Sequence, residues 1–526
     1  MVVIGSVIYG LSTHEFKLKK ASLNPSNTAT LIRKKKRLDM YNHTQHRLNL
    51  IKIHSAQFLI PQLTEPAVKD SSTQLIGARW LLTMAASPSA SAETASLIEN
   101  GGVVVRNGVI TEVGDFDSLN NQLREQSHSD NQNHTDHLGF ESNFLEEHIL
   151  LPGLINNHGH LAMSLLRGYA DDTPLQTWLQ DHIWPAESKF VSSEFVRDGS
   201  LLAMTEMLLS GTTTFADMYF FPEECAEAAE VAGMRANIFF PVLEFPSAWG
   251  SGADDYLEKG LALHDRYKNM SLINIGFGPH APYTVSNGTF EKVAMYSAEL
   301  EAAIQTHLHE TANEIQESIA EHGCRPIMRL KELGVLGSRT QTVHMTQIEN
   351  EEIDILANVG GSVIHCPSSN LKLASGFPPL QKMLNAGLVV GLGTDGAASN
   401  NTLDLLEEAR LSSLVSKFIN KDASCYSCYQ ALYCLTKGGA EAAGLGEQLG
   451  SLEVGKQADI IAINTQTAAL QPVHNPYSQI VNTAAGAAVN HVWINGNAIV
   501  RNRLLVNVEQ ADIIERAQHW QSQLAK

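Results

Sequence analysis

Four residues of the chain have the chemical character of ligands for a divalent metal ion. His158 and His160 are separated by one residue, so on an extended strand both imidazoles project to the same side. Two imidazoles in this arrangement form half of a site for zinc or another borderline ion, although most H-x-H patterns bind nothing. A third imidazole, His307, and a carboxylate, Asp395, would complete the ligand set. Such a set leaves a position open for water, which is typical of a catalytic metal site.

Glu310 is a candidate for proton transfer beside this metal. It follows His307 by three residues, and a carboxylate there could carry a proton from water to a leaving group or ring nitrogen. The alternative interpretation is an acidic residue in the first turn of a helix, where the helix dipole favours negative charge. The neighbouring metal ligands favour the catalytic interpretation.

These residues can act together only if the fold brings them to one place. Between residues 148 and 445, short apolar runs alternate with amphipathic helical patterns such as 193–209 and 223–232. This alternation predicts an α/β fold with a (β/α)8 barrel, because a doubly wound sheet usually has fewer strands. The eight predicted strands are 149–156, 212–217, 236–242, 273–278, 303–307, 340–344, 361–365 and 388–394.

The barrel prediction can be tested on the strand ends, because catalytic groups of such barrels lie at the C-terminal ends of the strands. The eighth run leads into Asp395, and five other runs lead into or end in histidine, although the chain contains only 21 histidines. Histidines placed by chance would not gather so consistently at the C-terminal ends of the strands, so we expect a metal-dependent site at that rim of the barrel. The histidines concerned are His158 with His160, His280, His307, His344 and His365.

The segments on either side of the barrel predict a second, small β domain. Residues 102–106 and 109–113 flank Asn107-Gly108, which is typical of a hairpin with a type I′ turn. Short strands separated by turns recur at 459–463, 491–494 and 499–500. We therefore expect a composite β-sandwich built from residues 74–147 and 446–510, with a solvated insertion loop at 124–147. Residues 511–526 are expected to form a C-terminal helix.

The composition of the 526 residues excludes several classes of protein. An apolar content of 44 % with 18 % charged residues is typical of a globular chain, and no apolar run reaches the length of a membrane span. The net charge of −19 argues against nucleic acid as a partner. Six cysteines form no disulfide framework and favour a reducing, cytoplasmic location. Residues 1–73 are basic, with eleven Lys and Arg against four acidic residues up to position 72, and we expect a poorly ordered extension.

The order of these motifs resembles that of the amidohydrolase superfamily. Residues 151–160 (LPGLINNHGH) resemble its first-strand motif, and His307-Leu-His-Glu310, His344, HCPSSN at 365–370 and Gly393-Thr-Asp395 follow in the same order. More narrowly, the chain resembles the 5′-methylthioadenosine/S-adenosylhomocysteine deaminases, a branch related to the triazine hydrolases. The segments that carry this narrower likeness, which extends from about residue 74 to 503, are LLRGYADD at 165–172, WPAE at 184–187, GPHAPY at 278–283 and SNLKLASG at 369–376.

The resemblance implies roles for individual residues. It implies a barrel with a composite β-sandwich and one divalent ion per subunit, which we expect to be Zn²⁺, although iron and manganese accept the same ligands. The implied metal ligands are His158, His160, His307 and Asp395. The implied catalytic residues are Glu310 as proton shuttle, His344 for the attacking hydroxide and Asp395 as acceptor of the water's proton, with Glu187 on the ribose hydroxyls and His280 on the nucleoside.

The resemblance further implies a hydrolase that acts on the C–N bond of a cyclic amidine in a small-molecule nucleoside. The region 245–254 contains Trp249 and no arginine, which favours an apolar 5′-methylthio group over the amino acid of S-adenosylhomocysteine. Arg167 and Arg235 could still reach a carboxylate there.

A homo-oligomeric state is possible from the sequence. Two other interpretations of the function also remain open at this point. One is an enzyme of the chlorohydrolase and aminohydrolase type that acts on a free heterocycle such as an s-triazine or guanine. Glu187 distinguishes it, because a free base has no ribose hydroxyls for this carboxylate to hold. The other is a non-catalytic scaffold, which the complete ligand set with Glu310 disfavours.

Overall fold

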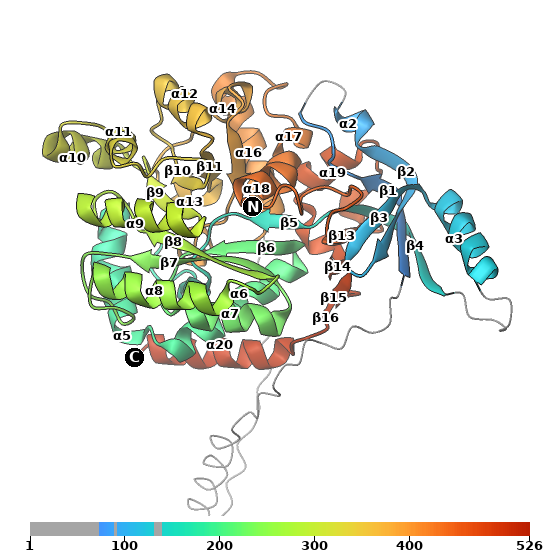
Figure 1. The fold of residues 1–526 in the computed structure, drawn as a ribbon, viewed down its shortest axis with the longest axis horizontal. Helices are drawn as coiled ribbons and strands as arrows, with labels where there is room; N and C mark the ends of the chain where they lie inside the picture. The colour runs from blue at the N-terminus through green and yellow to red at the C-terminus, as the bar shows by residue number, and fades with distance from the viewer. Residues whose placement is uncertain (1–72, 89–91, 131–138) are drawn as a thin grey trace, which may run out of the picture. The chain divides into compact units, whose positions relative to one another are not determined.

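The computed structural model describes residues 73–88, 92–130 and 139–526, and within them the chain forms two eight-stranded sheets (Figure 1). The predicted N-terminal extension lies outside the described residues, except for Thr73 at its end. Within the described residues, no helix combines the length and the apolar character that a membrane crossing requires.

One sheet is the predicted barrel. Its strands are parallel and follow one another in sequence order, as is expected when each strand is connected to the next by a helical crossover. The backbone N–H of Asn157 donates to the carbonyl of Leu392 at 2.9 Å and joins the first strand to the last. The barrel strands are β5 (Leu154–Asn156), β6 (Thr212–Asp217), β7 (Arg235–Val242), β8 (Ile273–Pro279), β9 (Ile304–Leu308), β10 (Thr340–His344), β11 (Ser362–His365) and β12 (Val389–Leu392).

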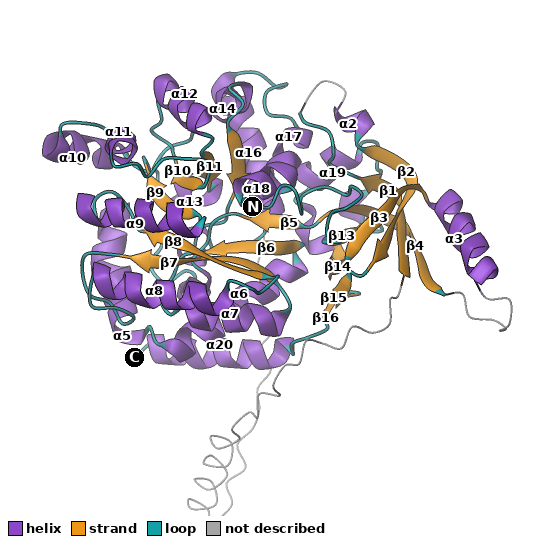
Figure 2. Cartoon of the chain, viewed as in Figure 1, coloured by secondary structure: helices purple, strands orange, loops and turns teal. Residues whose placement is uncertain are grey.

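Helices surround these strands (Figure 2). Their starts carry the expected caps: the Ser192 and Ser286 side chains accept the N–H of Phe195 and Thr289. Helix and strand approach closely at Gly260, where a Cβ atom would lie 2.2 Å from the Phe240 ring. The helical elements are η1 (Leu161–Leu166), α4 (Leu175–Thr177), η2 (Trp178–Ile183), α5 (Trp184–Phe190), α6 (Ser193–Leu209), α7 (Pro222–Ala232), α8 (Ala253–Tyr267), α9 (Asn287–Leu300), α10 (Ala312–His322), α11 (Pro326–Glu332), α12 (Asn350–Val359), α13 (Pro367–Lys372), α14 (Leu380–Asn385), α15 (Ala397–Asn400), α16 (Leu405–Asn420), α17 (Cys428–Leu435) and α18 (Lys437–Ala442).

The second sheet is mixed and combines strands from both sides of the barrel sequence. β4 pairs in parallel with β1 on one edge and antiparallel with β13 on the other, which joins the two segments into one sheet. Residues of both segments share one apolar cluster, including Val103, Leu150, Ile460 and Trp493. Its strands are β1 (Thr73–Leu82), β2 (Leu97–Arg106), β3 (Val109–Asp115), β4 (Phe140–Pro152), β13 (Ile460–Asn464), β14 (Val489–Ile494), β15 (Asn497–Arg501) and β16 (Leu504–Leu505). Its helical elements and the C-terminal helix are α2 (Ala92–Ala95), α3 (Phe116–Asp130), η3 (Ala468–Leu470), α19 (Pro476–Asn482), η4 (Ala485–Ala488) and α20 (Gln510–Leu524).

The predicted fold class is confirmed, and so is the hairpin at Asn107-Gly108. β2 and β3 pair antiparallel up to Arg106 and Val109, and both turn residues have positive φ, +52° for Asn107 and +78° for Gly108, as a type I′ turn requires. The division of the chain into domains at the stated boundaries stays a prediction.

Two predicted segments differ from the structure. The run 149–156 is divided between the sheets, because β4 ends at Pro152 and β5 begins at Leu154. Part of the expected loop at 124–147 is regular structure, since α3 extends to Asp130, β4 begins at Phe140, and only 131–138 lie outside the described residues. The helix was missed because its apolar residues, Phe116, Leu119 and Leu123, which pack together on the sheet, all precede position 124.

Candidate active site and metal centre

A cavity of about 520 Å³ opens at the C-terminal ends of the barrel strands. Seven of the eight predicted site residues line it: His160, Glu187, His280, His307, Glu310, His344 and Asp395. The eighth, His158, is fully buried and does not line the cavity, but it contacts His160 and His307 through ring pairs with centroids 4.8 and 4.9 Å apart. The cavity therefore brings together residues from segments more than 200 positions apart in the chain.

Nitrogen and oxygen atoms converge at the centre of this site. Nε2 of His307 lies 3.2 Å from Nε2 of His158, and Oδ1 of Asp395 lies 3.6 Å from Nε2 of His158 and 3.3 Å from Nε2 of His160. Two compact groups result, one of His158, His160 and Asp395 and one of His158, His307 and His344, each with its ligand atoms within 4.8 Å of one another. The sequence predicts that His158 and His160 lie in the first barrel strand. The structure differs, because β5 ends at Asn156 and both histidines follow it.

Each of the three imidazoles is held through its Nδ1 atom by an oxygen acceptor. The acceptors are the side-chain oxygen of Gln305 for His158 at 2.6 Å, the carbonyl of Met218 for His160 at 2.7 Å, and the carbonyl of His280 for His307 at 2.7 Å. Because an oxygen acceptor needs Nδ1–H, each neutral ring presents an unprotonated Nε2 to the centre. Facing lone pairs 3.2 Å apart beside a carboxylate are the donor set that a divalent cation fits.

The electrostatics of the cluster agree with this fit. Burial and the neighbouring imidazoles hold the pKa of His307 well below its ordinary value and lower that of His158 to about 3, so both rings are neutral at pH 7 and could bind a cation. Despite burial, hydrogen bonds and positive charge from His160 hold the pKa of Asp395 well below its ordinary value. Burial lowers the pKa of His160 too, but the hydrogen bond and charge of Asp395 outweigh it and raise this pKa to about 9. A proton and a metal ion compete for this Nε2 atom.

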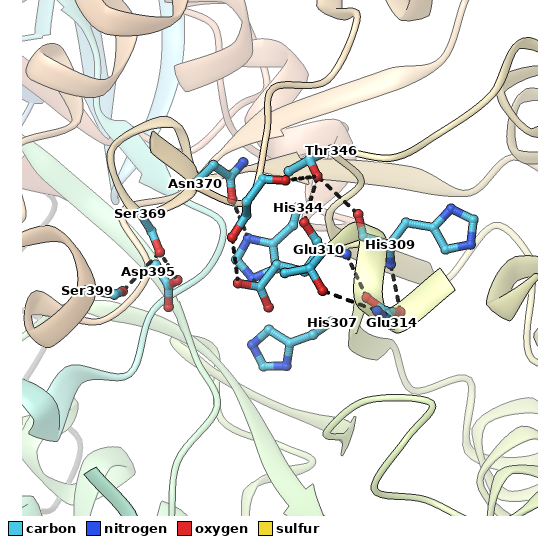
Figure 3. Close-up of polar contacts among 12 residues, drawn as sticks. His307, His309, Glu310, Glu314, His344, Thr346, Ser369, Asn370, Asp395 and Ser399 are labelled. Carbon is cyan, nitrogen blue, oxygen red and sulfur yellow. Dashed lines mark hydrogen bonds and ion pairs between the residues drawn. The ribbon is translucent and has the colours of Figure 1, made fainter. Parts of the chain in front are cut away.

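Asp395 is oriented by residues that sequence reasoning did not assign. The Ser369 hydroxyl donates to Oδ2 of Asp395 at 2.7 Å (Figure 3), and the N–H of Gly396 donates to Oδ1 at 2.7 Å. The same Ser369 hydroxyl lies 3.0 Å from that of Ser399, which lines the cavity. Both oxygens of the carboxylate are therefore hydrogen-bonded, and Oδ1 also faces the imidazoles of His158 and His160.

Glu310 and His344 face each other beside this cluster. Oε2 of Glu310 lies 3.8 Å from Nε2 of His344, and the Ser375 hydroxyl donates to Oε1 at 3.4 Å. Nδ1 of His344 lies 2.8 Å from the amide oxygen of Asn370, so the neutral ring carries its proton on Nδ1 and leaves Nε2 as the acceptor. Burial raises the pKa of Glu310, which suits a group that both accepts and donates a proton.

Glu187 lines the same cavity from α5. The hydroxyl of Tyr219, just past the end of β6, donates to Oε1 of Glu187 at 2.7 Å. Burial raises the pKa of this carboxyl to about 7, although the Tyr219 bond opposes the shift. His280 is held at Nδ1 by the Thr284 hydroxyl at 3.0 Å and presents its Nε2 to the cavity.

Three residues considered from the sequence do not reach the cavity. The Trp249 ring is buried and its N–H donates to the Glu223 carboxylate at 3.1 Å, whereas residues 245–248 do line the site. Arg167 donates to Glu206 and to the carbonyl of Asn401. Arg235 lies buried at the start of β7 and pairs with Asp459 at 3.2 Å, at the opposite end of the strand from the site.

His365, one of the histidines at the strand ends, also lies outside the cavity lining. Its ring packs against Phe377 with centroids 4.7 Å apart, and its Nδ1 lies 3.3 Å from the Asn370 amide nitrogen.

The sequence contained a signal for two site residues that the sequence analysis did not assign. Tyr219 follows a strand end, and Gln305 lies two positions before His307, on the same side of a strand.

The comparisons with known proteins agree on one family. Residues 149–499 match the model of the amidohydrolase family. A 5-methylthioadenosine/S-adenosylhomocysteine deaminase of Saccharophagus degradans is 47 % identical over 453 residues, 86 % of this chain and 97 % of that protein. One of Teredinibacter turnerae is 52 % identical over 376 residues, 72 % of this chain and 85 % of that protein.

A solved structure has the same fold. The crystal structure of an adenosine deaminase from Xanthomonas campestris with bound zinc aligns with a TM-score of 0.80 and 38 % identity, covering 86 % of this chain and 99 % of that one. The sequence match and the shared architecture together show that the chain belongs to the amidohydrolase family.

Proposed function

We propose that the protein is a metal-dependent hydrolase that deaminates a 5′-substituted adenosine, preferably 5′-methylthioadenosine, to the inosine analogue and ammonia. The observation that carries the proposal is the position of Glu187, which shares one cavity with Glu310, His344 and the imidazole cluster. A carboxylate that lines the same cavity and belongs to neither compact ligand group suits the two hydroxyls of a ribose, which a free base lacks. The deaminase names of relatives 47 and 52 % identical support the assignment.

The cofactor of the proposed enzyme is one Zn²⁺ per subunit, held by His158, His160, His307 and Asp395. The Nδ1 bonds of the three imidazoles and the Ser369 bond of Asp395 fit this group. When bound there, the ion would supply a nucleophile at neutral pH, because coordination lowers the pKa of water from about 15.7 to about 7.

The residues of the chain supply the remaining chemistry. Asp395 accepts the proton of the attacking water, and Glu310 delivers a proton to the ring nitrogen N1, which makes C6 electrophilic. In the neutral form of His344, Nε2 accepts a hydrogen bond from the attacking water, which orients the water oxygen toward C6. The C6–O bond forms, the proton held by Asp395 passes to the amine, and the C6–N bond breaks to release ammonia. The hydroxyl left on C6 returns its proton to Glu310, which gives the 6-oxopurine.

The 5′ group of the substrate lies in an apolar part of the cavity. Among the described residues that line it, none is lysine or arginine, and the carboxylate of S-adenosylhomocysteine would find no cationic partner. Arg167 and Arg235 are engaged elsewhere. The apolar lining includes Leu175, Trp178, Leu179, Ile183, Trp184, Leu243, Phe245 and Pro246.

The substrate is therefore a small-molecule nucleoside. The six cysteines favour a reducing, cytoplasmic compartment, and the acidic composition argues against a nucleic-acid partner. Ammonia release from 5′-methylthioadenosine, S-adenosylhomocysteine, adenosine and guanine by the zinc-loaded protein tests the proposal. We expect the highest kcat/KM with 5′-methylthioadenosine. Turnover of guanine with none of the adenosine derivatives would instead support an enzyme acting on free bases.

A further inference from the structure

Glu314 is a buried carboxylate outside the cavity lining whose hydrogen bonds reach the catalytic segment. It lies in the first turn of α10 and is 6 % exposed. Its Oε1 accepts the backbone N–H of His309 at 2.9 Å, and its Oε2 accepts that of Glu310 at 2.7 Å (Figure 3). The side chain thus extends back past Thr311, the N-cap of its own helix, and binds the two preceding peptide groups.

The opposite side of the Glu310 peptide is held as well. The hydroxyl of Thr346, which follows β10 and is 8 % exposed, donates to the carbonyl of Glu310 at 2.6 Å (Figure 3). Both backbone polar groups of Glu310 are therefore bound by side chains of other segments. His309 next to it has φ of +54°, a left-handed conformation that a residue with a side chain seldom adopts without such support.

This anchoring contrasts with the weak hold on the Glu310 side chain. Its carboxylate has one hydrogen bond in the described part of the chain, from Ser375 at 3.4 Å, and lies 3.8 Å from His344. A proton shuttle must reach N1 of the substrate and then the hydroxyl group formed at C6, so its carboxylate has to remain free to move. The hydrogen bonds to the backbone must then fix the position of the Glu310 Cα atom.

We propose that Glu314 is a positioning residue for the proton transfer by Glu310. The inference rests on the proposed function and adds a residue to its mechanism. Two N–H groups converge on one side chain, and only a carboxylate offers an acceptor oxygen to each of them. A glutamine of the same size offers one oxygen and places its NH₂ group against the second N–H. Glu314→Gln therefore releases one end of the 309–310 segment without changing side-chain volume.

The test compares Glu314→Gln with Glu317→Gln, the same substitution at an exposed position on the same helix. Zinc-loaded proteins are assayed with 5′-methylthioadenosine. We expect Glu314→Gln to lower kcat about 10- to 100-fold while KM changes less than about threefold, because a displacement of about 1 Å costs up to about 100-fold in rate. Zinc content should stay at the wild-type level, and Glu317→Gln should match the wild type.

A double substitution separates positioning from a general structural effect. If Glu314 acts through the Glu310 carboxylate, then Glu314→Gln costs little further activity in a Glu310→Gln background. A structural defect of the whole site would instead lower the residual activity by the same factor in both backgrounds. That result would overturn the proposal, as would an unchanged kcat for Glu314→Gln or a loss confined to zinc content or KM.

A second variant serves if Glu314→Gln does not fold. Thr346→Val keeps the shape of the side chain and removes the donor to the Glu310 carbonyl from the other side. It should also lower kcat at nearly constant KM, and an unchanged kcat would contradict the proposal. Failure of the proposed function is distinguishable, because the wild-type protein would then release no ammonia from the adenosine derivatives.

Discussion

The side-chain oxygen of Gln305 lies 2.6 Å from Nδ1 of His158, at the bottom of the imidazole cluster. The orientation of this amide is set by its NH₂ group, which donates to the carbonyl of Asn157 at 2.9 Å and to the side chain of Gln341 at 2.7 Å. The Gln305 oxygen must then face His158 and accept a hydrogen bond from Nδ1–H, which keeps the proton of the neutral imidazole on Nδ1. Gln305 therefore directs the Nε2 lone pair of His158 toward the cluster.

Replacement of Gln305 should weaken metal binding. Gln305→Met keeps the length of the side chain and removes the acceptor, and we expect zinc affinity to fall about 10- to 100-fold. Competition with a chelator measures this affinity. Gln316→Met, at an exposed position on α10, is the matched control and should bind zinc as the wild type does. Equal affinities in all three proteins would contradict this role for Gln305.

Loss of the Glu310 carboxyl group should abolish most of the activity without loss of metal. Glu310→Gln cannot take up or release the proton, and we expect kcat to fall about 10²- to 10⁴-fold. Zinc content, measured by atomic absorption, should remain that of the wild type, because Glu310 is outside both compact ligand groups. If Glu310→Gln keeps more than a tenth of the wild-type kcat, another residue must carry out the proton transfer.

Much of the fold was predictable because its signals are local. Alternating strand and helix patterns indicate the barrel, and a strand end places its next residues at one rim, so the convergence of His158, His307 and Asp395 followed from position alone. Their role as metal ligands stays a prediction. The hairpin was similarly predictable, because Asn107-Gly108 tolerates positive φ at both positions.

The contacts that orient the site were not predictable in this way. The bonds of Ser369 to Asp395 and of Thr346 to Glu310 join segments 26 and 36 positions apart and depend on how loops of neighbouring strands pack. Trp249 and Arg235 were considered for the substrate pocket because of their residue types. In the structure, Trp249 instead binds Glu223 and Arg235 pairs with Asp459, so neither side chain reaches the cavity.

The carboxylate of Glu187 should decide between nucleosides and free bases. Glu187→Ala should lower kcat/KM for 5′-methylthioadenosine about 100-fold, because the ribose hydroxyls lose a charged acceptor, worth about 1.5–3 kcal/mol per hydrogen bond. Tyr219→Phe removes the donor to Oε1 of Glu187 and should cost about 3- to 10-fold, mainly in KM. Tyr296→Phe, outside the cavity lining, is the control. Equal losses with 9-methyladenine, which has no ribose, would contradict the assignment of Glu187 to the sugar.

The stability of the fold should depend on pH through Asp404, the N-cap of α16. Its Oδ1 accepts the N–H of Leu406 at 2.9 Å, and burial raises the pKa of this carboxyl to about 7. The folded protein then binds a proton that the unfolded chain releases near pH 4. The stabilisation is complete below about pH 4 and is lost as pH rises to 7, by up to about 1.4 kcal/mol per pH unit.

Asp404→Asn keeps a capping side chain and carries no charge, so it lacks this loss. The free energy of unfolding of Asp404→Asn, relative to the wild type, should therefore increase by about 1–3 kcal/mol between pH 5 and pH 7.5 and then level off. Urea unfolding at a series of pH values measures the difference. Asp354→Asn, at an exposed position on α12, should show a difference that does not change with pH. A constant difference for Asp404→Asn as well would mean that Asp404 is already ionised in the folded protein at pH 5.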